Sequence, residues 1–99
     1  AGPLRLDPNA HEATLDGQPL PLTFKEFQLL QLLMENRDRA LSRTELLRLV
    51  WGTDYCGETR TLDMHIGTLR HKLGDGAEDS RFIKTVRGVG YRFIGGSQG

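Results

Sequence analysis

Few side chains of this sequence could do catalytic or metal chemistry, and their spacing does not bring them together. The candidates are His11, His65, His71, Asp54, Asp63 and Cys56. A catalytic site needs convergent residues, and Cys56 with His65 and His71 matches no standard zinc spacing. The two later histidines would also lie on different faces of one helix. We therefore expect no enzyme, no metal and no cofactor. Cys56 is interpreted as a loop thiol and His11 as a surface residue of a strand.

The basic residues offer a different chemistry, the recognition of a polyanion. The 99 residues carry no net charge, but residues 1–58 hold six Lys/Arg against nine Asp/Glu, a balance of −3. Residues 59–99 hold seven against four, a balance of +3. Affinity for DNA phosphates depends on clustered Lys and Arg, so the second part is suited to nucleic acid and the first to other partners.

The segment from Arg60 to Leu73 is predicted to be an amphipathic helix, with Thr59 as its N-cap and Gly74 as its stop. Its apolar stripe consists of Leu62, Ile66, Leu69 and Leu73. At about 100° per residue, the opposite face presents Arg60, Met64, Gly67, Thr68 and His71. This face is flanked on one side by Asp63 and Arg70, and on the other by Thr61, His65 and Lys72.

An α-helix of this kind can enter the major groove of DNA, with its flanking donors on the phosphates. Gly67 favours this interpretation, because a glycine in a helix interior costs roughly 0.8–1.0 kcal/mol relative to alanine. A small residue there allows the helix backbone to approach a base edge closely. The alternative is an ordinary polar face that is merely solvated.

A second candidate contact is the segment Thr85 to Tyr91, which is predicted to be a tight hairpin with Arg87 at its tip. Gly88 and Gly90 are expected to supply positive φ angles. An exposed arginine on a narrow hairpin is suited to the minor groove, where negative potential is focused. The alternative is a plain turn with a solvated arginine. A phosphate-binding glycine loop is disfavoured, because no helix follows Gly90.

Other elements must position this helix and this hairpin. Residues 4–22 are predicted to form an antiparallel sheet of three or four short strands, with Asp16-Gly17 as a type I′ turn. Two capping boxes, Thr23-x-x-Glu26 and Ser42-x-x-Glu45, mark helix starts. The first of these helices carries the apolar positions Phe24, Phe27, Leu30, Leu33 and Met34 and ends near Asn36, and the second carries Leu46, Leu47, Val50 and Trp51 and ends at Gly52.

The remaining segments complete one α+β domain over residues 1–99. Ala40-Leu41 leaves room only for a short extended link, and residues 82–86 and 91–94 are predicted to be the two strands of the terminal hairpin. The order of sheet, three helices and C-terminal β-hairpin is that of a winged helix-turn-helix. No apolar run approaches the roughly 18 residues of a membrane span, and a lone cysteine suits the cytoplasm. Residues 95–99 are interpreted as a frayed tail.

The chain resembles the C-terminal effector domain of OmpR/PhoB-type two-component response regulators. The matching motifs are Leu22-Thr23-x-x-Glu26-Phe27, Ser42-Arg43-x-x-Leu46-Leu47-x-x-Val50-Trp51-Gly52, Arg60-Thr61-Leu62-Asp63-x-His65-Ile66-x-x-Leu69-Arg70-x-Lys72-Leu73 and Ile83-x-Thr85-Val86-Arg87-Gly88-x-Gly90-Tyr91-Arg92-Phe93. The resemblance implies sequence-specific binding of double-stranded DNA at promoters, with the third helix in the major groove and the hairpin wing on the minor groove. It also implies self-association on tandem half-sites and control by phosphorylation of a receiver domain that is absent from this chain.

The resemblance also assigns residues. Those expected in the recognition helix are Arg60, Thr61, Asp63, Met64, His65, Gly67, Thr68, Arg70 and His71, and those expected on the wing and the DNA backbone are Trp51, Thr85, Arg87, Gly88 and Tyr91. A loop expected to touch RNA polymerase contains Thr53, Asp54, Tyr55, Gly57 and Glu58. The chain departs from the family at Gly67 and Thr68, where many relatives have arginine. Its bases must therefore be contacted by Asp63, Met64, Thr68 or His71.

A third class of function is a winged helix used only for protein–protein contact, which the acidic first part supports. The basic second part and its arginine-tipped wing count against it. A salt titration separates the two classes, because neutralising phosphates gives a steep negative slope and a protein-only module gives no DNA binding to titrate.

Overall fold

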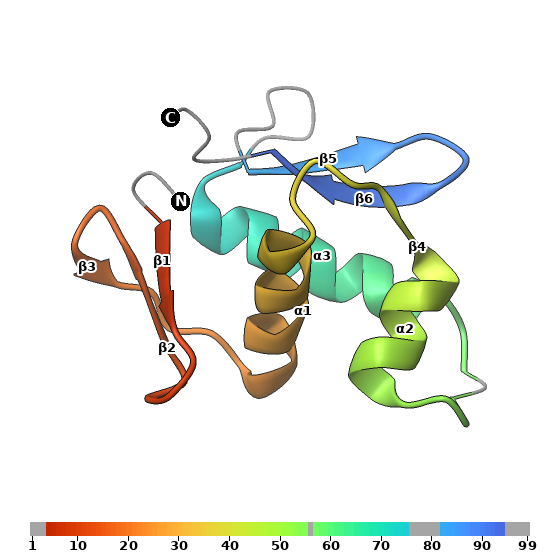
Figure 1. Ribbon diagram of the computed structural model, residues 1–99, viewed down its shortest axis with the longest axis horizontal. Coiled ribbons are helices and arrows are strands. Elements are labelled where there is room, and N and C mark those ends of the chain that lie inside the picture. The colour runs from red at the N-terminus through yellow and green to blue at the C-terminus, as the bar shows by residue number, and fades with distance from the viewer. Residues whose placement is uncertain (1–3, 56, 76–81, 95–99) are drawn as a thin grey trace.

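The computed structural model describes residues 4–55, 57–75 and 82–94, which form two small antiparallel sheets around three helices (Figure 1). The N-terminal sheet lies on one side of α1, and α2 lies on the other. The α+β winged-helix architecture predicted from the sequence is confirmed. Cys56, residues 76–81 and the tail expected at residues 95–99 lie outside the described residues.

The N-terminal sheet consists of β1 (Leu4–Asp7), β2 (Glu12–Leu15) and β3 (Gln18–Pro19), in that order and antiparallel. Leu4 pairs with Leu15 and Leu6 with Ala13. Asp16 and Gly17 have φ angles of 54° and 79°, as a type I′ turn requires at its two central positions. The predicted hairpin is therefore confirmed.

His11 does not belong to a strand, as the sequence had suggested, but to the turn between β1 and β2. It has a φ of 57°, and its ring lies 4.8 Å from that of Phe24 and 3.9 Å from that of Phe27. Phe24, one of the apolar positions noted in the first helix, is 61% exposed and does not belong to the core. The stacked rings join the N-terminal sheet to the start of that helix.

Helices α1 (Phe24–Glu35) and α2 (Arg43–Trp51) begin at the two predicted caps. The capping box of α1 is complete: the Glu26 backbone N–H donates to Thr23, and the Thr23 N–H donates to the Glu26 carboxylate. The second box is only half formed. Ser42 accepts from the Glu45 N–H at 3.0 Å, but the Glu45 carboxylate pairs with Arg39 at 3.6 Å.

The Glu26 side chain is buried, which its place in a capping box did not predict. Its Oε1 accepts from the Thr23 N–H at 2.9 Å and from Lys72 Nζ at 2.6 Å. Buried carboxylates are normally paired. This one fastens the start of α1 to the third helix.

Helix α3 (Arg60–Leu73) crosses α1 (Figure 1), and the four residues of its apolar stripe are buried in the core. Its end is as predicted, because Gly74 is left-handed with a φ of 76°. Its start is not. Thr59 has helical backbone angles, and its side chain makes no capping hydrogen bond.

The second sheet has the order β4-β6-β5, formed by β4 (Leu41–Ser42), β5 (Ile83–Val86) and β6 (Gly90–Phe93). The sequence predicted the β5-β6 hairpin to within a residue or two at each end but interpreted Leu41 as part of a link. Leu41 instead pairs with Tyr91, and Ser42 pairs with Gly90. The wing hairpin is therefore part of a sheet whose remaining strand, β4, leads directly into α2. No helix in the described ranges is long and apolar enough to cross a membrane.

Candidate nucleic-acid interface

The predicted division of α3 into a core face and a free face is confirmed. Its apolar stripe is buried in the core cluster. The residues of the opposite face are all exposed: Arg60, Met64, Gly67, Thr68 and His71. The fold itself therefore does not occupy this face of the helix.

The middle of the free face carries little hydrogen-bonding capacity. The Thr68 hydroxyl lies 3.2 Å from the Met64 carbonyl oxygen and 3.0 Å from that of His65, so it bonds back to its own helix. A Cβ added to Gly67 would meet no atom within 4 Å. Gly67 is therefore not required by packing inside this domain.

At the edge of this face, the Asp63 carboxylate is turned toward the wing. Its Oδ1 accepts from Arg43 Nε at 2.9 Å and from the Tyr91 hydroxyl at 2.6 Å. Both of these donors bond the same oxygen. The sequence had placed Asp63 among the residues available to contact bases, and the fold instead gives it partners from α2 and β6.

The contacts among Asp63, Tyr91 and Arg43 shift the pKa values of these side chains. Partial burial alone would raise the pKa of Asp63, but the hydrogen bonds from Tyr91 and Arg43 and the charge of Arg43 lower it below the ordinary value. Burial, followed by the bond to Asp63, raises the pKa of Tyr91. Asp63 is thus held as a carboxylate and Tyr91 as a neutral phenol that donates to it.

Arg70 also lies against the Tyr91 ring. Its guanidinium carbon lies 5.5 Å from the ring centroid, and that of Arg43 lies 5.7 Å away. Arg70 also donates to the Ile83 carbonyl oxygen and, at 2.7 Å, to Thr85 Oγ1. Two arginines are therefore fixed by cation–π contacts and hydrogen bonds where α3 meets the wing.

A second group of rings lies around Trp51, at the end of α2. The Trp51 ring is in an edge-to-face contact with His65 at 4.9 Å, and Lys25 Nζ lies 5.5 Å from the Trp51 centroid. Lys25 also donates to the Val50 carbonyl oxygen at 2.9 Å. His65 Nδ1 is 2.8 Å from the Thr61 carbonyl oxygen.

The wing tip is built as predicted at Gly88 but not at Gly90. The Val89 N–H donates to the Val86 carbonyl oxygen at 2.9 Å, and Gly88 has a φ of 75°. Gly90 has no positive φ. It is a glycine because a Cβ there would overlap the Leu41 carbonyl oxygen of β4.

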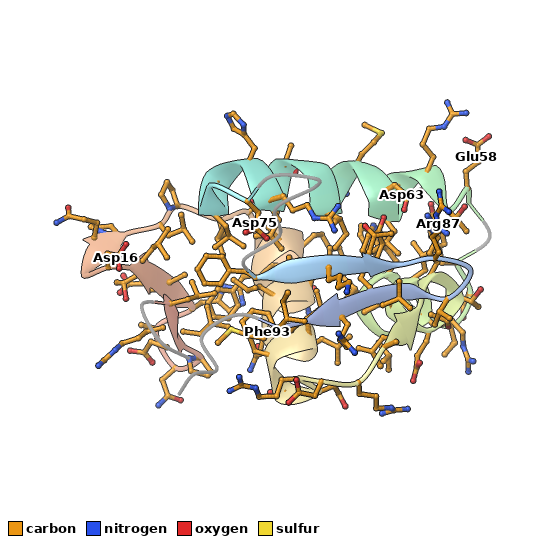
Figure 2. The ribbon with its side chains drawn as sticks, turned by 90° about the horizontal axis from the view of Figure 1, so that it is seen from above. Asp16, Glu58, Asp63, Asp75, Arg87 and Phe93 are labelled. Carbon is orange, nitrogen blue, oxygen red and sulfur yellow. The ribbon has the colours of Figure 1, made fainter. Side chains whose placement is uncertain are left out.

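The tip residue Arg87 is exposed. Figure 2 shows it at the same end of the molecule as Asp63 and Glu58, whereas Asp16 of the N-terminal sheet lies at the opposite end. The wing tip and the N-terminal part of α3 thus share one end of the domain.

The loop between α2 and α3 presents Thr53, Asp54, Gly57 and Glu58 to solvent. Tyr55 differs from these neighbours, because its hydroxyl lies 3.1 Å from the Glu58 carbonyl oxygen and 3.0 Å from Thr61 Oγ1. Tyr55 therefore joins the loop to the first turn of α3.

The sequence analysis did not single out Arg43 and Lys25, which the fold brings to the interface. Arg43 had a local signal: it stands in the first turn of α2, where the helix dipole disfavours a cation. An arginine there points to a partner elsewhere, and the partner is Asp63. Lys25 stands in the first turn of α1 and carried the same signal, and its partners are the Trp51 ring and the Val50 carbonyl oxygen of α2.

The comparisons with known proteins agree with this geometry. Residues 17–93 match the family described as "Transcriptional regulatory protein, C terminal". The chain is 44% identical over 95 residues to the sensory transduction protein RegX3 of Mycolicibacterium smegmatis, with 96% of this chain aligned. It spans 42% of the length of that relative.

Many solved structures share the fold, and two illustrate it. One is the Klebsiella pneumoniae RstA DNA-binding domain in complex with the RstA box, with a TM-score of 0.87, 35% identity, and coverage of 94% of this chain and 92% of that one. The other is the response regulator DrrB, a Thermotoga maritima OmpR/PhoB homologue, with a TM-score of 0.86, 34% identity, and coverage of 95% and 42%. The chain therefore belongs to the family of C-terminal domains of transcriptional regulatory proteins, as an effector domain of the OmpR/PhoB type.

Proposed function

We propose that this domain binds double-stranded DNA in a sequence-specific manner, as the transcription-regulating output domain of a two-component response regulator. The observation that carries the proposal is the free face of α3. Arginines lie beside this face, and the exposed Arg87 lies at the same end of the domain. Related domains of the same family include one solved on its DNA box.

In this proposal α3 enters the major groove and the wing lies on the adjacent minor groove. Arg60, Thr61, His65, Arg70, Thr85 and Trp51 are assigned to the phosphates. Tyr91, which the resemblance also placed there, is buried and donates its hydroxyl to Asp63, so its role is to position Asp63. Arg70 keeps donors for this role, because a guanidinium has five N–H groups and three of its bonds go to Ile83 and Thr85. Arg87 and Gly88 are assigned to the minor groove.

The test begins with selection of bound duplexes from a random pool, followed by salt titration on the selected site. A steep fall of log K with log salt supports phosphate neutralisation. Failure to enrich any sequence would refute the proposal and favour a winged helix that contacts only proteins. In the same assay, Arg87→Ala is expected to weaken binding more than Arg48→Ala, which removes an equal charge from an exposed site on α2.

We further propose that the loop between α2 and α3 contacts RNA polymerase through its exposed residues Thr53, Asp54, Gly57 and Glu58. In transcription assays with the longer regulator, Glu58→Lys should then reduce activation while DNA affinity is retained. Unchanged activation would refute the contact.

We also propose that the longer protein carries a receiver domain, that this domain self-associates on tandem half-sites, and that the protein is cytoplasmic; the response-regulator relatives support the first of these. Binding stoichiometry on DNA with one and with two selected half-sites tests the self-association. A single copy on the double site would contradict it.

A further inference from the structure

The middle of the free face of α3 is apolar. Met64 is 64% exposed there, on a helix whose other large apolar residues are buried. Next to it Gly67 offers only backbone, with open space where a side chain would stand. An exposed methionine beside a bare glycine contributes little to solubility or to this fold, so both residues point to a partner with apolar groups.

Thr68 adds to this surface through its methyl group and not through its hydroxyl. The hydroxyl bonds back to the Met64 and His65 carbonyl oxygens, and it is also close enough to Glu26 to help lower the pKa of that buried carboxyl. Burial alone would raise the pKa of Glu26, and the hydrogen bond from Lys72 is the main influence that lowers it below the ordinary value. Because the Thr68 oxygen is held toward the protein, its methyl group is the part left for a partner.

The Asp63 carboxylate at the edge of this surface is also engaged in hydrogen bonds within the domain. Asp63 Oδ1 is shared by Arg43 and Tyr91, which leaves the carboxylate engaged with α2 and β6. The remaining polar residues of the free face, Arg60 and His71, stand toward its two ends. A central base edge would therefore meet a methionine, a glycine and a methyl group.

We infer that Met64, Gly67 and the Thr68 methyl group discriminate bases by apolar contact with the 5-methyl groups of thymine. The inference rests on the proposed DNA binding and specifies how that site selects its sequence. Thymine is the base that presents a methyl group in the major groove, and apolar side chains contact it there. The bare backbone at Gly67 provides room for the base edge to come close.

The direct test uses wild-type protein and the duplex selected from a random pool. Each thymine of a half-site is replaced in turn by deoxyuridine, which lacks only the 5-methyl group. Burial of one such group is worth about 0.8 kcal/mol, so we expect about fourfold weaker binding at one or two positions in each half-site. Thymines outside the half-sites serve as controls and should tolerate the replacement.

A matched pair of variants separates the two ends of the Thr68 side chain. Thr68→Val keeps a methyl group and removes the hydroxyl, and Thr68→Ser does the reverse. We expect Thr68→Val to retain the distinction between thymine and deoxyuridine. Thr68→Ser should bind about fourfold more weakly to thymine and lose the distinction between thymine and deoxyuridine at one position. Met64→Ala should lose that distinction at a neighbouring position, and melting curves show whether each variant is folded.

Three results would overturn the inference while leaving DNA binding intact. They are a selected half-site with no invariant thymine, equal wild-type affinity for thymine and deoxyuridine at every half-site position, and tight binding by Thr68→Ser together with weak binding by Thr68→Val. Failure of wild-type protein to bind any duplex would instead refute the proposed function itself. The outcomes for the two proposals are therefore distinct.

Discussion

Gly67 shows at the scale of one residue how a contact surface and a stable helix make different demands. A glycine in a helix interior is roughly 0.8–1.0 kcal/mol less favourable than alanine, and a Cβ here would meet no atom. We therefore expect Gly67→Ala to raise the free energy of unfolding by about that amount, and the melting temperature by about 4–8 °C. The added methyl group would stand between the helix backbone and DNA, so affinity for the selected site should fall.

Two measurements check this prediction, thermal unfolding and binding to the selected duplex. Leu49→Ala is the control, because Leu49 is also exposed on a helix but lies on α2. It should leave DNA affinity unchanged. A Gly67→Ala protein that is more stable and binds as tightly as wild type would show that DNA does not approach the backbone at this position.

At the scale of elements, the wing contains two glycines that are needed for different reasons. Gly88 is needed for its φ of 75°, and Gly90 for its close approach to the Leu41 carbonyl oxygen. Asparagine tolerates left-handed backbone but still has a Cβ. Gly88→Asn should therefore be nearly neutral, whereas Gly90→Asn should lower the free energy of unfolding by about 1–3 kcal/mol, the usual cost of overpacking.

Urea unfolding of the two variants decides the matter, because both introduce the same side chain two positions apart. Equal losses of stability would contradict the distinction. So would a Gly90→Asn protein as stable as wild type, since it would mean that β4 and β6 can move apart at no cost.

The same two glycines show which features the sequence could predict. Helix ends and the Asp16-Gly17 turn are set by neighbouring residues, so their positions follow from local patterns. The left-handed Gly88 belongs with them. Gly90, by contrast, depends on β4, a strand of two residues about fifty positions earlier in the chain. No local pattern encodes that contact, and Gly90 was therefore assigned the wrong role.

The candidate site also combines features that follow from local sequence patterns with features that depend on distant residues. The free face of α3 followed from helical periodicity, and its exposure is confirmed. The orientation of the polar side chains of α3 did not follow from helical periodicity. Asp63 lies on α3, but its orientation is set by Arg43 from α2 and Tyr91 from β6. Likewise, the burial of Glu26 depends on Lys72, which comes from another helix.

At the scale of the whole molecule, the Glu26–Lys72 pair ties stability to pH. The folded-state pKa of Glu26 is below its ordinary value of 4.5. Its stabilising contribution is therefore complete above that value and is lost as the pH falls through the lowered folded-state pKa. We expect Glu26→Gln to be less stable than wild type at pH 7, and the difference to narrow below about pH 4.5.

Urea unfolding of both proteins between pH 7 and pH 3 measures this difference. Asp63 also has a lowered pKa, but it is present in both proteins and cancels in the comparison. Glu35→Gln, at the exposed end of α1, is the control and should leave the wild-type pH profile unchanged. A stability difference between wild type and Glu26→Gln that stayed constant down to pH 3 would show that Glu26 does not contribute through its charge.

The separation of the two faces of α3 has a consequence for how such a domain diversifies. One face consists of Leu62, Ile66, Leu69 and Leu73. These residues are packed in the core, which restricts the side chains that can replace them. On the other face, a Cβ added at position 67 would meet no other atom of the described residues within 4 Å. Mutation there can therefore alter which promoters are recognised without first passing through a less stable protein. The domain can acquire new targets by drift at a few exposed positions while its scaffold is inherited unchanged.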